Sequence, residues 1–389
     1  MRSEPNYNTI PVGQLGIIAL PGCEELANKI DNYLIRWRFQ RNSEHKDTLA
    51  FAGYEKSTYL INMDFPRFGT GEGKAALNQT VRGYDIYILC DVFNYGVTYK
   101  MYGITVPMSP DEHFANLKRA ISAIEGKAKR VSVIMPMLYE GRQHKRSSRE
   151  SLDCAMMLQE LHNMGVENFI TFDAHDPRVM NAIPLCGFES ISPAYQMIKA
   201  AVNNVDNLKI NKDNIMIISP DEGGMSRCIY YSTVLGVELG MFYKRRDFSR
   251  IVDGRNPIIA HEFLGDNVEG KDVIIVDDMI SSGESMIEVA TKLKELKAAR
   301  IYIFSAFGLF CNGFDAFDKA FQEGIIDRVF TTNLIYGTPE LLSKDWYVRV
   351  DMSKYLSYII DTLNHDTSIS DLLDPAEKIN TLLDKKGLK

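Results

Sequence analysis

The stretch of residues 271–286, KDVIIVDDMISSGESM, restricts the possible folds of this chain more than any other. Residues 273–276 form an apolar, β-branched run, which is typical of a strand buried on both faces of a parallel sheet. Asp277 and Asp278 follow at the carboxyl end of this predicted strand, and a helical pattern begins near Met286. The stretch therefore predicts a strand, a loop and a helix within an α/β domain.

The loop between the two acids and the helix combines small hydroxyl residues with one glycine, at Ser281, Ser282, Gly283, Glu284 and Ser285. A glycine-containing turn that enters a helix exposes backbone N–H groups beside the positive end of the helix dipole, which favours phosphate binding. The carboxylates of Asp277 and Asp278 can accept hydrogen bonds from a sugar diol or hold hydrated Mg²⁺. These groups together indicate a phosphorylated pentose; the alternative is an ordinary helix cap after a strand.

Apolar strand-like runs alternate with helical patterns along most of the chain. The predicted strands cover residues 16–20, 84–90, 130–136, 168–173, 214–218, 272–276 and 300–305. The predicted helices cover residues 23–37, 113–124, 151–164, 194–203, 286–296 and 313–324. This alternation predicts βαβ units and parallel sheets. A break near residues 190–193 gives expected domains at 1–192 and 193–345, followed by a C-terminal extension at 346–389.

The composition is that of an ordinary globular protein, with 45% hydrophobic and 24% charged residues among 389. A net charge of −7 argues against a general nucleic-acid binder. The six cysteines form no C-x-x-C pair, which fits buried thiols in a reducing compartment. No apolar run reaches the length of a membrane span. We therefore expect a cytoplasmic protein without nucleic-acid or membrane partners.

Three predicted strands end in acidic residues. One ends in Asp173, His175 and Asp176, another in Asp221, and the third in Asp277. Ligands of open parallel sheets bind beyond the carboxyl ends of the strands. Acids repeated at this position suit divalent metal and phosphate chemistry, and three such ends are hard to attribute to capping alone.

Asp221 also begins a second candidate anion loop, which consists of Asp221, Glu222, Gly223 and Gly224. Adjacent glycines permit positive φ angles and let the backbone approach a ligand closely. The alternative is a plain turn.

Two basic loops are further candidates for phosphate binding. The first is RQHKRSSR, with Arg142, Gln143 and Arg149, and the second contains Lys244 and Arg246. Such charge runs are more often solvated surfaces. Arginine nevertheless suits fork-like phosphate binding, and lysine supplies a mobile point charge.

Residues 69–75, GTGEGKA, look like a phosphate-binding P-loop but fail the pattern. The glycine spacing is wrong, Ala75 replaces the metal-binding hydroxyl residue, and no apolar strand precedes the segment. Walker-type nucleotide binding is therefore rejected.

Taken together, the motif blocks resemble those of ribose-phosphate diphosphokinases over nearly the whole chain, from Gly16 to about Leu373. The distinctive blocks are RQHKRSSR, FDAHD, SPDEGG, YKRR, VDDMISSGES and Thr332-Asn333. Plain phosphoribosyltransferases share only the VDD loop. The resemblance implies two phosphoribosyltransferase-like domains, each a mostly parallel sheet flanked by helices, in a dimer-based homo-oligomer such as a hexamer.

The resemblance also implies a reaction, in which the β,γ-diphosphoryl group of ATP passes to the 1-hydroxyl of ribose 5-phosphate with Mg²⁺. ATP would be held by Phe68, Glu72, Arg142, Gln143 and Arg149, where Phe68 stacks on adenine in a segment that reaches a neighbouring subunit's site. Mg²⁺ would be held by His175 and Asp221. The diphosphate would lie against Asp221, Glu222, Gly223 and Gly224. Ribose 5-phosphate would be bound by Asp277, Asp278, Ser281, Ser282, Gly283, Glu284 and Ser285. Lys244 and Arg246 would stabilise the transferring group.

Three residues depart from the family pattern. Ser281 stands where many members carry aspartate, Glu284 replaces a glycine, and His144 replaces an acid. The stretch at residues 36–63 and the tail beyond Asp374 are also longer than in most members. Two alternatives to the active enzyme therefore stay open: a catalytically silent regulatory paralogue and, less favoured, a phosphoribosyltransferase.

Overall fold

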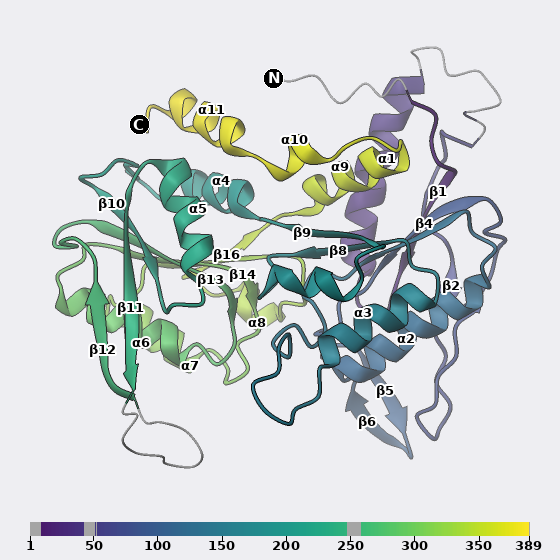
Figure 1. Cartoon of the computed structure of the whole chain (residues 1–389), viewed down its shortest axis with the longest axis horizontal. Helices are drawn as coiled ribbons and strands as arrows, with labels where there is room; N and C mark the ends of the chain where they lie inside the picture. The colour runs from purple at the N-terminus through teal and green to yellow at the C-terminus, as the bar shows by residue number, and fades with distance from the viewer. Residues whose placement is uncertain (1–8, 43–50, 52, 247–257, 389) are drawn as a thin grey trace. The chain divides into compact units, whose positions relative to one another are not determined.

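The computed structural model describes residues 9–42, 51, 53–246 and 258–388, and it excludes the side chains of residues 42, 244–246 and 258–261. The chain divides into two compact units that are each assembled from separate segments (Figure 1). Unit 1 comprises Met1–Ser192, Asn333–Tyr336 and Asp351–Leu373, and unit 2 comprises Pro193–Thr332, Gly337–Val350 and Asp374–Lys389. No described helix combines the length and the apolar run that a membrane crossing requires.

Unit 1 is built on a five-stranded parallel sheet in the order β1-β4-β7-β8-β9. Its strands are β1 (Gln14–Ala19), β4 (Tyr84–Leu89), β7 (Arg130–Ile134), β8 (Asn168–Phe172) and β9 (Gly187–Ile191). Two short antiparallel pairs accompany the sheet: β2 (Met63–Asp64) with β3 (Ala76–Leu77), and β5 (Thr98–Met101) with β6 (Ile104–Pro107). The helices are α1 (Glu24–Asn42), α2 (Pro110–Ile124), α3 (Asp153–Asn163), the 3₁₀ helix η2 (Pro177–Ala182), α9 (Ser353–Asn364) and α10 (Ser370–Leu373).

Helix α2 illustrates how local sequence fixes an element of unit 1. Ser109 accepts a hydrogen bond from the Glu112 N–H, and the Glu112 carboxylate accepts one from the Ser109 N–H, which forms a capping box. Pro110 occupies the first turn, where its missing N–H is harmless. Glu125 ends the helix in a left-handed conformation.

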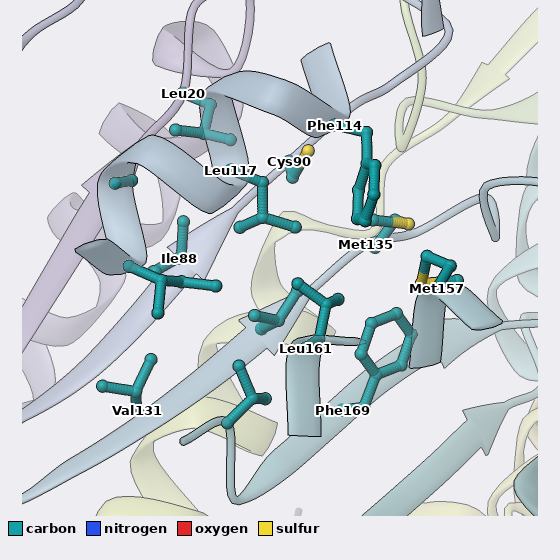
Figure 2. Close-up of a cluster of buried hydrophobic side chains, with 14 of the residues drawn as sticks. Leu20, Ile88, Cys90, Phe114, Leu117, Val131, Met135, Met157, Leu161 and Phe169 are labelled. Atoms are coloured by element: carbon teal, nitrogen blue, oxygen red, sulfur yellow. The ribbon is translucent and has the colours of Figure 1, made fainter. Parts of the chain in front are cut away.

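The apolar faces of α2 and α3 cover one face of this sheet. Figure 2 shows the resulting core, to which the sheet, α2 and α3 all contribute: Leu20, Ile88, Cys90, Phe114, Leu117, Val131, Met135, Met157, Leu161 and Phe169. Each large apolar side chain buried in this way contributes about 1.5–3 kcal/mol.

Unit 2 is built on a seven-stranded sheet in the order β12-β11-β10-β13-β14-β15-β16, in which only β12 runs antiparallel to its neighbour. Its strands are β10 (Ile215–Ser219), β11 (Glu238–Arg246), β12 (Ile258–Leu264), β13 (Asp272–Ile280), β14 (Ile301–Gly308), β15 (Arg328–Thr332) and β16 (Tyr347–Val350). Its helices are α4 (Ala194–Asn204), α5 (Met225–Leu235), α6 (Glu284–Glu295), α7 (Asp315–Gln322), α8 (Pro339–Leu342) and α11 (Ala376–Lys386). Residues of α6 and α7 pack with β10, β13 and β14 in its core.

The C-terminal region at 346–389, expected as an extension, is divided between the units. Strand β16 and helix α11 belong to unit 2, whereas α9 and α10 belong to unit 1. Helix α9 lies against α1, with Trp37 stacked on Tyr358 at 4.3 Å between ring centroids. The chain therefore returns to unit 1 after most of unit 2 has been formed.

A buried charge network joins α1 to α9. Arg38 and Arg41 both form ion pairs with Asp361, and Arg38 also donates to Asn364 at 2.6 Å. Burial alone would raise the pKa of Asp361. The positive charges of Arg38 and Arg41 have the larger effect and hold this pKa below its usual value. Asp361 is therefore ionised in the folded protein.

Candidate functional site

Strand β13 extends beyond the end of its neighbour β10, and Asp277 and Asp278 lie in the extended part. The β10–β13 pairing stops at Ile218–Ile275, whereas β13 stays paired with β14 as far as Ile280. Asp277 and Asp278 lie in this overhang, so they are part of the strand and do not follow it, contrary to the sequence prediction. The reason is β14, whose backbone continues the ladder through Gly308.

The two carboxylates have different surroundings. Asp278 is 3% exposed, whereas the Asp277 side chain is 21% exposed and its Oδ1 accepts a hydrogen bond from the Asp278 N–H at 2.9 Å. Burial and the neighbouring Asp278 raise the pKa of Asp277. Arg227 lies in the first turn of α5, with its Nη1 3.6 Å from Asp277 Oδ1. Its positive charge opposes this rise in the pKa of Asp277.

Sequence reasoning missed Arg227, which stands three residues after Gly224. Its only signal in the sequence is its position one turn into the helix that follows the second candidate anion loop. Cys228, the next residue, also links α5 to β13, because its Sγ lies 3.4 Å from the Val276 carbonyl oxygen.

The loop after β13 is a glycine turn that leads directly into α6. Gly283 has a φ of 86° and is the N-cap of α6, which begins at Glu284, two residues earlier than predicted. A Cβ atom at position 283 would overlap the Phe317 ring, so only glycine fits there. Ser281 is anchored through its carbonyl, which accepts a hydrogen bond from the Cys311 N–H at 2.8 Å. Ser282 and Ser285 flank this glycine turn, one on each side.

The Asp221–Gly224 loop lies between β10 and α5, next to the first loop because β10 and β13 are neighbours. Asp221 folds back on this loop, since its Oδ1 accepts from the Gly224 N–H at 3.2 Å and its carbonyl accepts from Ser219 Oγ at 2.7 Å. Glu222 and Gly223 complete the turn. The structure brings the two predicted anion loops to one edge of the sheet.

The paired glycines of this loop do not use the positive φ angles that glycine permits. Gly224 has a φ of −79° and neither glycine is in the left-handed region. Gly224 is favoured by space instead, because a Cβ there would lie 3.0 Å from Ser219 Oγ.

Lys244 and Arg246 end β11, where their backbone pairs with β12. The predicted basic loop is therefore strand through Arg246, because β12 continues the ladder beside it. The side chains of both residues lie outside the described part of the chain.

In unit 1, the candidate ATP residues occupy two segments. Phe68, 55% exposed, and Glu72, also exposed, bracket a tight turn in which the Phe68 N–H donates to the Glu72 carbonyl at 2.8 Å. Arg142 and Arg149 are exposed, and Gln143 donates through Nε2 to the Ser151 carbonyl at 2.8 Å.

His144 brings the basic segment to the FDAHD segment after β8. Its Nε2 lies 3.5 Å from Asp176 Oδ2, and its ring centroid lies 5.3 Å from that of the exposed His175. Hydrogen bonds from Arg178 lower the pKa of Asp176 to about 2. The structure therefore brings together two blocks that the sequence separates by about thirty residues.

The two proposed magnesium ligands belong to different units, His175 to unit 1 and Asp221 to unit 2. Within the described residues, no group of three or more histidine, cysteine, aspartate or glutamate side chains could hold a metal ion by itself. Mg²⁺ commonly binds through one or two carboxylates, with waters and substrate phosphates as the remaining ligands. Asp221 at the head of an anion loop fits that donor set.

Three family models match the chain, and the second and third overlap over residues 250–308. They are the N-terminal domain of ribose phosphate pyrophosphokinase over residues 15–165, a phosphoribosyl transferase domain over 188–308, and a phosphoribosyl synthetase-associated domain over 250–374. The ribose-phosphate pyrophosphokinase of Vibrio parahaemolyticus is 26% identical over 309 residues, which cover 78% of this chain and 88% of that protein. The Shewanella oneidensis protein of the same name is 27% identical, with the same coverage.

A solved structure shows the same fold. The phosphoribosylpyrophosphate synthetase from Mycobacterium smegmatis matches with a TM-score of 0.71 at 18% identity, over 91% of this chain and 99% of that one. Two parallel sheets flanked by helices, each with loops at the strand ends, define a protein of the phosphoribosyltransferase-like class. The chain belongs to the ribose-phosphate pyrophosphokinase family, a family of enzymes. The family and the fold class predicted from the sequence are confirmed.

Proposed function

We propose that the protein transfers the β,γ-diphosphoryl group of ATP to the 1-hydroxyl of ribose 5-phosphate, giving 5-phosphoribosyl 1-diphosphate and AMP. The observation that carries the proposal is the overhang of β13, where two acids precede a glycine turn that caps α6. The acids suit the sugar hydroxyls, and the turn at the N-terminus of α6 suits the 5-phosphate. Family membership supports the same substrates.

In the proposed reaction, the 1-hydroxyl oxygen attacks the β-phosphorus of ATP. The bond between that phosphorus and the oxygen bridging it to the α-phosphate breaks, AMP leaves with the bond electrons, and the hydroxyl proton passes to solvent. Catalysis of this kind needs positioning and charge stabilisation, without a covalent intermediate. Asp277 and Asp278 would orient the sugar, the backbone of Ser281–Ser285 would hold its phosphate, and Phe68 and Glu72 would hold adenine.

Cationic groups would neutralise the negative charge of the diphosphoryl group. Arg142, Gln143 and Arg149 would contact the ATP phosphates, and Lys244 and Arg246 would face the charge that develops as the bond breaks. His175 and Asp221 would hold Mg²⁺, which when bound neutralises the phosphate oxygens.

The direct test measures AMP released from ATP with Mg²⁺, with and without ribose 5-phosphate. We expect AMP in equal amount to 5-phosphoribosyl 1-diphosphate, only when the sugar phosphate is present, and no turnover after chelation with EDTA. AMP release without ribose 5-phosphate, or full activity in EDTA, would contradict the proposal.

Lys244→Ala tests charge stabilisation. Loss of a cation that acts mainly in the transition state should lower kcat by about 10²–10³ and change the KM for ribose 5-phosphate little. Lys319→Ala is the matched control, because Lys319 is an exposed helix residue whose described charge partner is Glu323. Equal kcat values for Lys244→Ala and the parent protein would remove Lys244 from the mechanism.

One observation favours the alternative of a silent regulatory paralogue. Glu284 places a carboxylate in the first turn of α6, where a phosphate would bind, and its Oε1 accepts a hydrogen bond from Asn312 at 3.3 Å. This negative charge opposes phosphate binding. Glu284→Gly should strengthen ribose 5-phosphate binding, and a parent protein that releases no AMP would support the regulatory alternative.

A further inference from the structure

The turn from Phe68 to Glu72 is held from the side by the hairpin of β5 and β6. The Tyr102 N–H, at the tip of the hairpin, donates to the Gly69 carbonyl at 2.8 Å. Gly71 has a φ of 95°, and a Cβ atom there would lie 2.8 Å from Met101 Sδ. The hairpin therefore packs closely against the turn, and the positive φ of residue 71 favours glycine there.

Arg67 holds the same turn through its guanidinium group. Its Nη1 donates to the Gly71 carbonyl at 2.9 Å, and its Nη2 lies 3.4 Å from Asn116 Oδ1 on α2. The guanidinium carbon lies 4.7 Å from the centre of the Tyr99 ring on β5, and Nη1 lies 3.7 Å from Glu112 Oε1. Arg67 thus connects the turn, the hairpin and α2 at one point.

The environment of Arg67 contrasts with that of the turn it supports. The Arg67 side chain is only 9% exposed, and its Nε finds no hydrogen-bond acceptor among the described residues. Phe68, directly after it, is 55% exposed, and Glu72 is exposed as well. A fixed backbone that presents an exposed aromatic ring and a carboxylate is pre-organised for a ligand, because little conformational entropy is lost on binding.

We propose that Arg67, braced by Tyr99, is a positioning residue that sets the selectivity of the site for adenine over guanine. The inference rests on the proposed function, in which Phe68 stacks on the base. Glu72 can accept a hydrogen bond from the exocyclic amino group of adenine, whereas guanine presents a carbonyl oxygen at the same ring position and is disfavoured there. Selection therefore depends on where the turn holds the Glu72 carboxylate.

Arg67→Met tests this role, because methionine keeps an apolar stem of similar length and removes the donors. We expect the KM for ATP to rise about tenfold, the value of one hydrogen bond to a charged group, while the KM for GTP changes less. The preference for ATP over GTP should fall, with the KM for ribose 5-phosphate and kcat at saturating ATP unchanged. Arg67→Lys, which keeps a donor for the Gly71 carbonyl, should recover part of the preference.

Two further variants separate positioning from a general loss of structure. Tyr99→Leu removes the ring beneath the guanidinium from another element and should reproduce the loss of selectivity. Ile104→Ser, on the same hairpin and 66% exposed, should leave both nucleotides unaffected. Hydrogen exchange supplies a readout without turnover: the amides of Phe68 and Gly71 should exchange faster in Arg67→Met, while the melting temperature changes little.

Each outcome decides between the hypotheses. If the parent protein uses ATP and Arg67→Met keeps its preference over GTP, the positioning role is overturned and the proposed function stands. If the parent protein neither binds ATP in calorimetry nor releases AMP, the proposed function fails first and the inference fails with it. Faster exchange at Phe68 and Gly71, together with lost selectivity, supports the inference.

Discussion

The turn after β13 requires glycine at residue 283, because there is no space for a Cβ atom beside the Phe317 ring. We predict that Gly283→Ala destabilises the protein by about 3 kcal/mol, because the methyl group meets the Phe317 ring and the positive φ is unfavourable as well. Gly270→Ala is the matched control, since Gly270 has a φ of 76° and open space where a Cβ would lie. It should cost only about 1 kcal/mol, the backbone term alone. Equal losses in urea unfolding would contradict the packing argument.

His365 gives the second prediction at this scale. Burial lowers its pKa from 6.5 to about 4 in the folded protein, although the nearby Asp361 opposes this shift. The unfolded chain therefore binds the proton more readily, so this contribution to stability is present above about pH 6.5 and is lost as the pH falls towards 4. The full loss amounts to roughly 3 kcal/mol.

The contribution of His365 must be measured as the difference in stability between the parent protein and a variant that lacks the imidazole. Burial raises the pKa of Asp91 to about 7, and this group acts with the opposite sign in the same pH range. We therefore compare unfolding of the parent protein and His365→Gln between pH 7 and 4.5, where the variant should lose less stability on acidification. Parallel curves would show that His365 does not titrate in this way.

At the scale of the element, β13 determines how the two acids differ. Successive residues of a strand point to opposite faces, so the carboxylates of Asp277 and Asp278 have different surroundings and need not contribute equally to sugar binding. We predict that Asp278→Ala weakens ribose 5-phosphate binding about tenfold or more and leaves ATP binding nearly unchanged, because a buried sugar hydroxyl loses its acceptor. Calorimetry with both ligands checks this. Equal losses for ATP and the sugar phosphate would indicate a structural role.

The elements also show what the sequence can predict. The seven predicted strands and six predicted helices are all present, because each carries an apolar run or stripe that the core buries. The hairpin of β5 and β6 was missed because its residues are mostly polar or exposed and show no core periodicity. Strand β13 was predicted four residues too short, since acids at residues 277–278 resemble a strand end when the β14 ladder is not known.

Some residues of the candidate site could likewise be predicted from the sequence, and others could not. The two candidate anion loops were predicted from residue type and spacing, and the structure places both after neighbouring strands of one sheet. Arg227 and Arg67 were not, since an arginine acquires its role from partners that are distant in the sequence, such as Asp277 and Tyr99.

At the scale of the molecule, unit 1 depends on a helix from the far end of the chain. Residues 1–192 alone would leave Arg38 and Arg41 without Asp361 and would expose to water the Trp37 ring that stacks on Tyr358 of α9. We predict that this fragment shows no cooperative thermal unfolding by circular dichroism. Joining residues 351–373 to it through a flexible linker should restore a transition. A cooperative transition in the short fragment would show that α9 is dispensable.

The place of α9 in the chain also sets an order of events during synthesis. Arg41 leaves the ribosome 320 residues before its partner Asp361. At about 5–20 residues per second, the first unit waits on the order of tens of seconds for its closing helix. During that interval the second unit has already begun to emerge. A nascent chain of this kind gains most from chaperones that shield the surface of α1 until α9 has been synthesised.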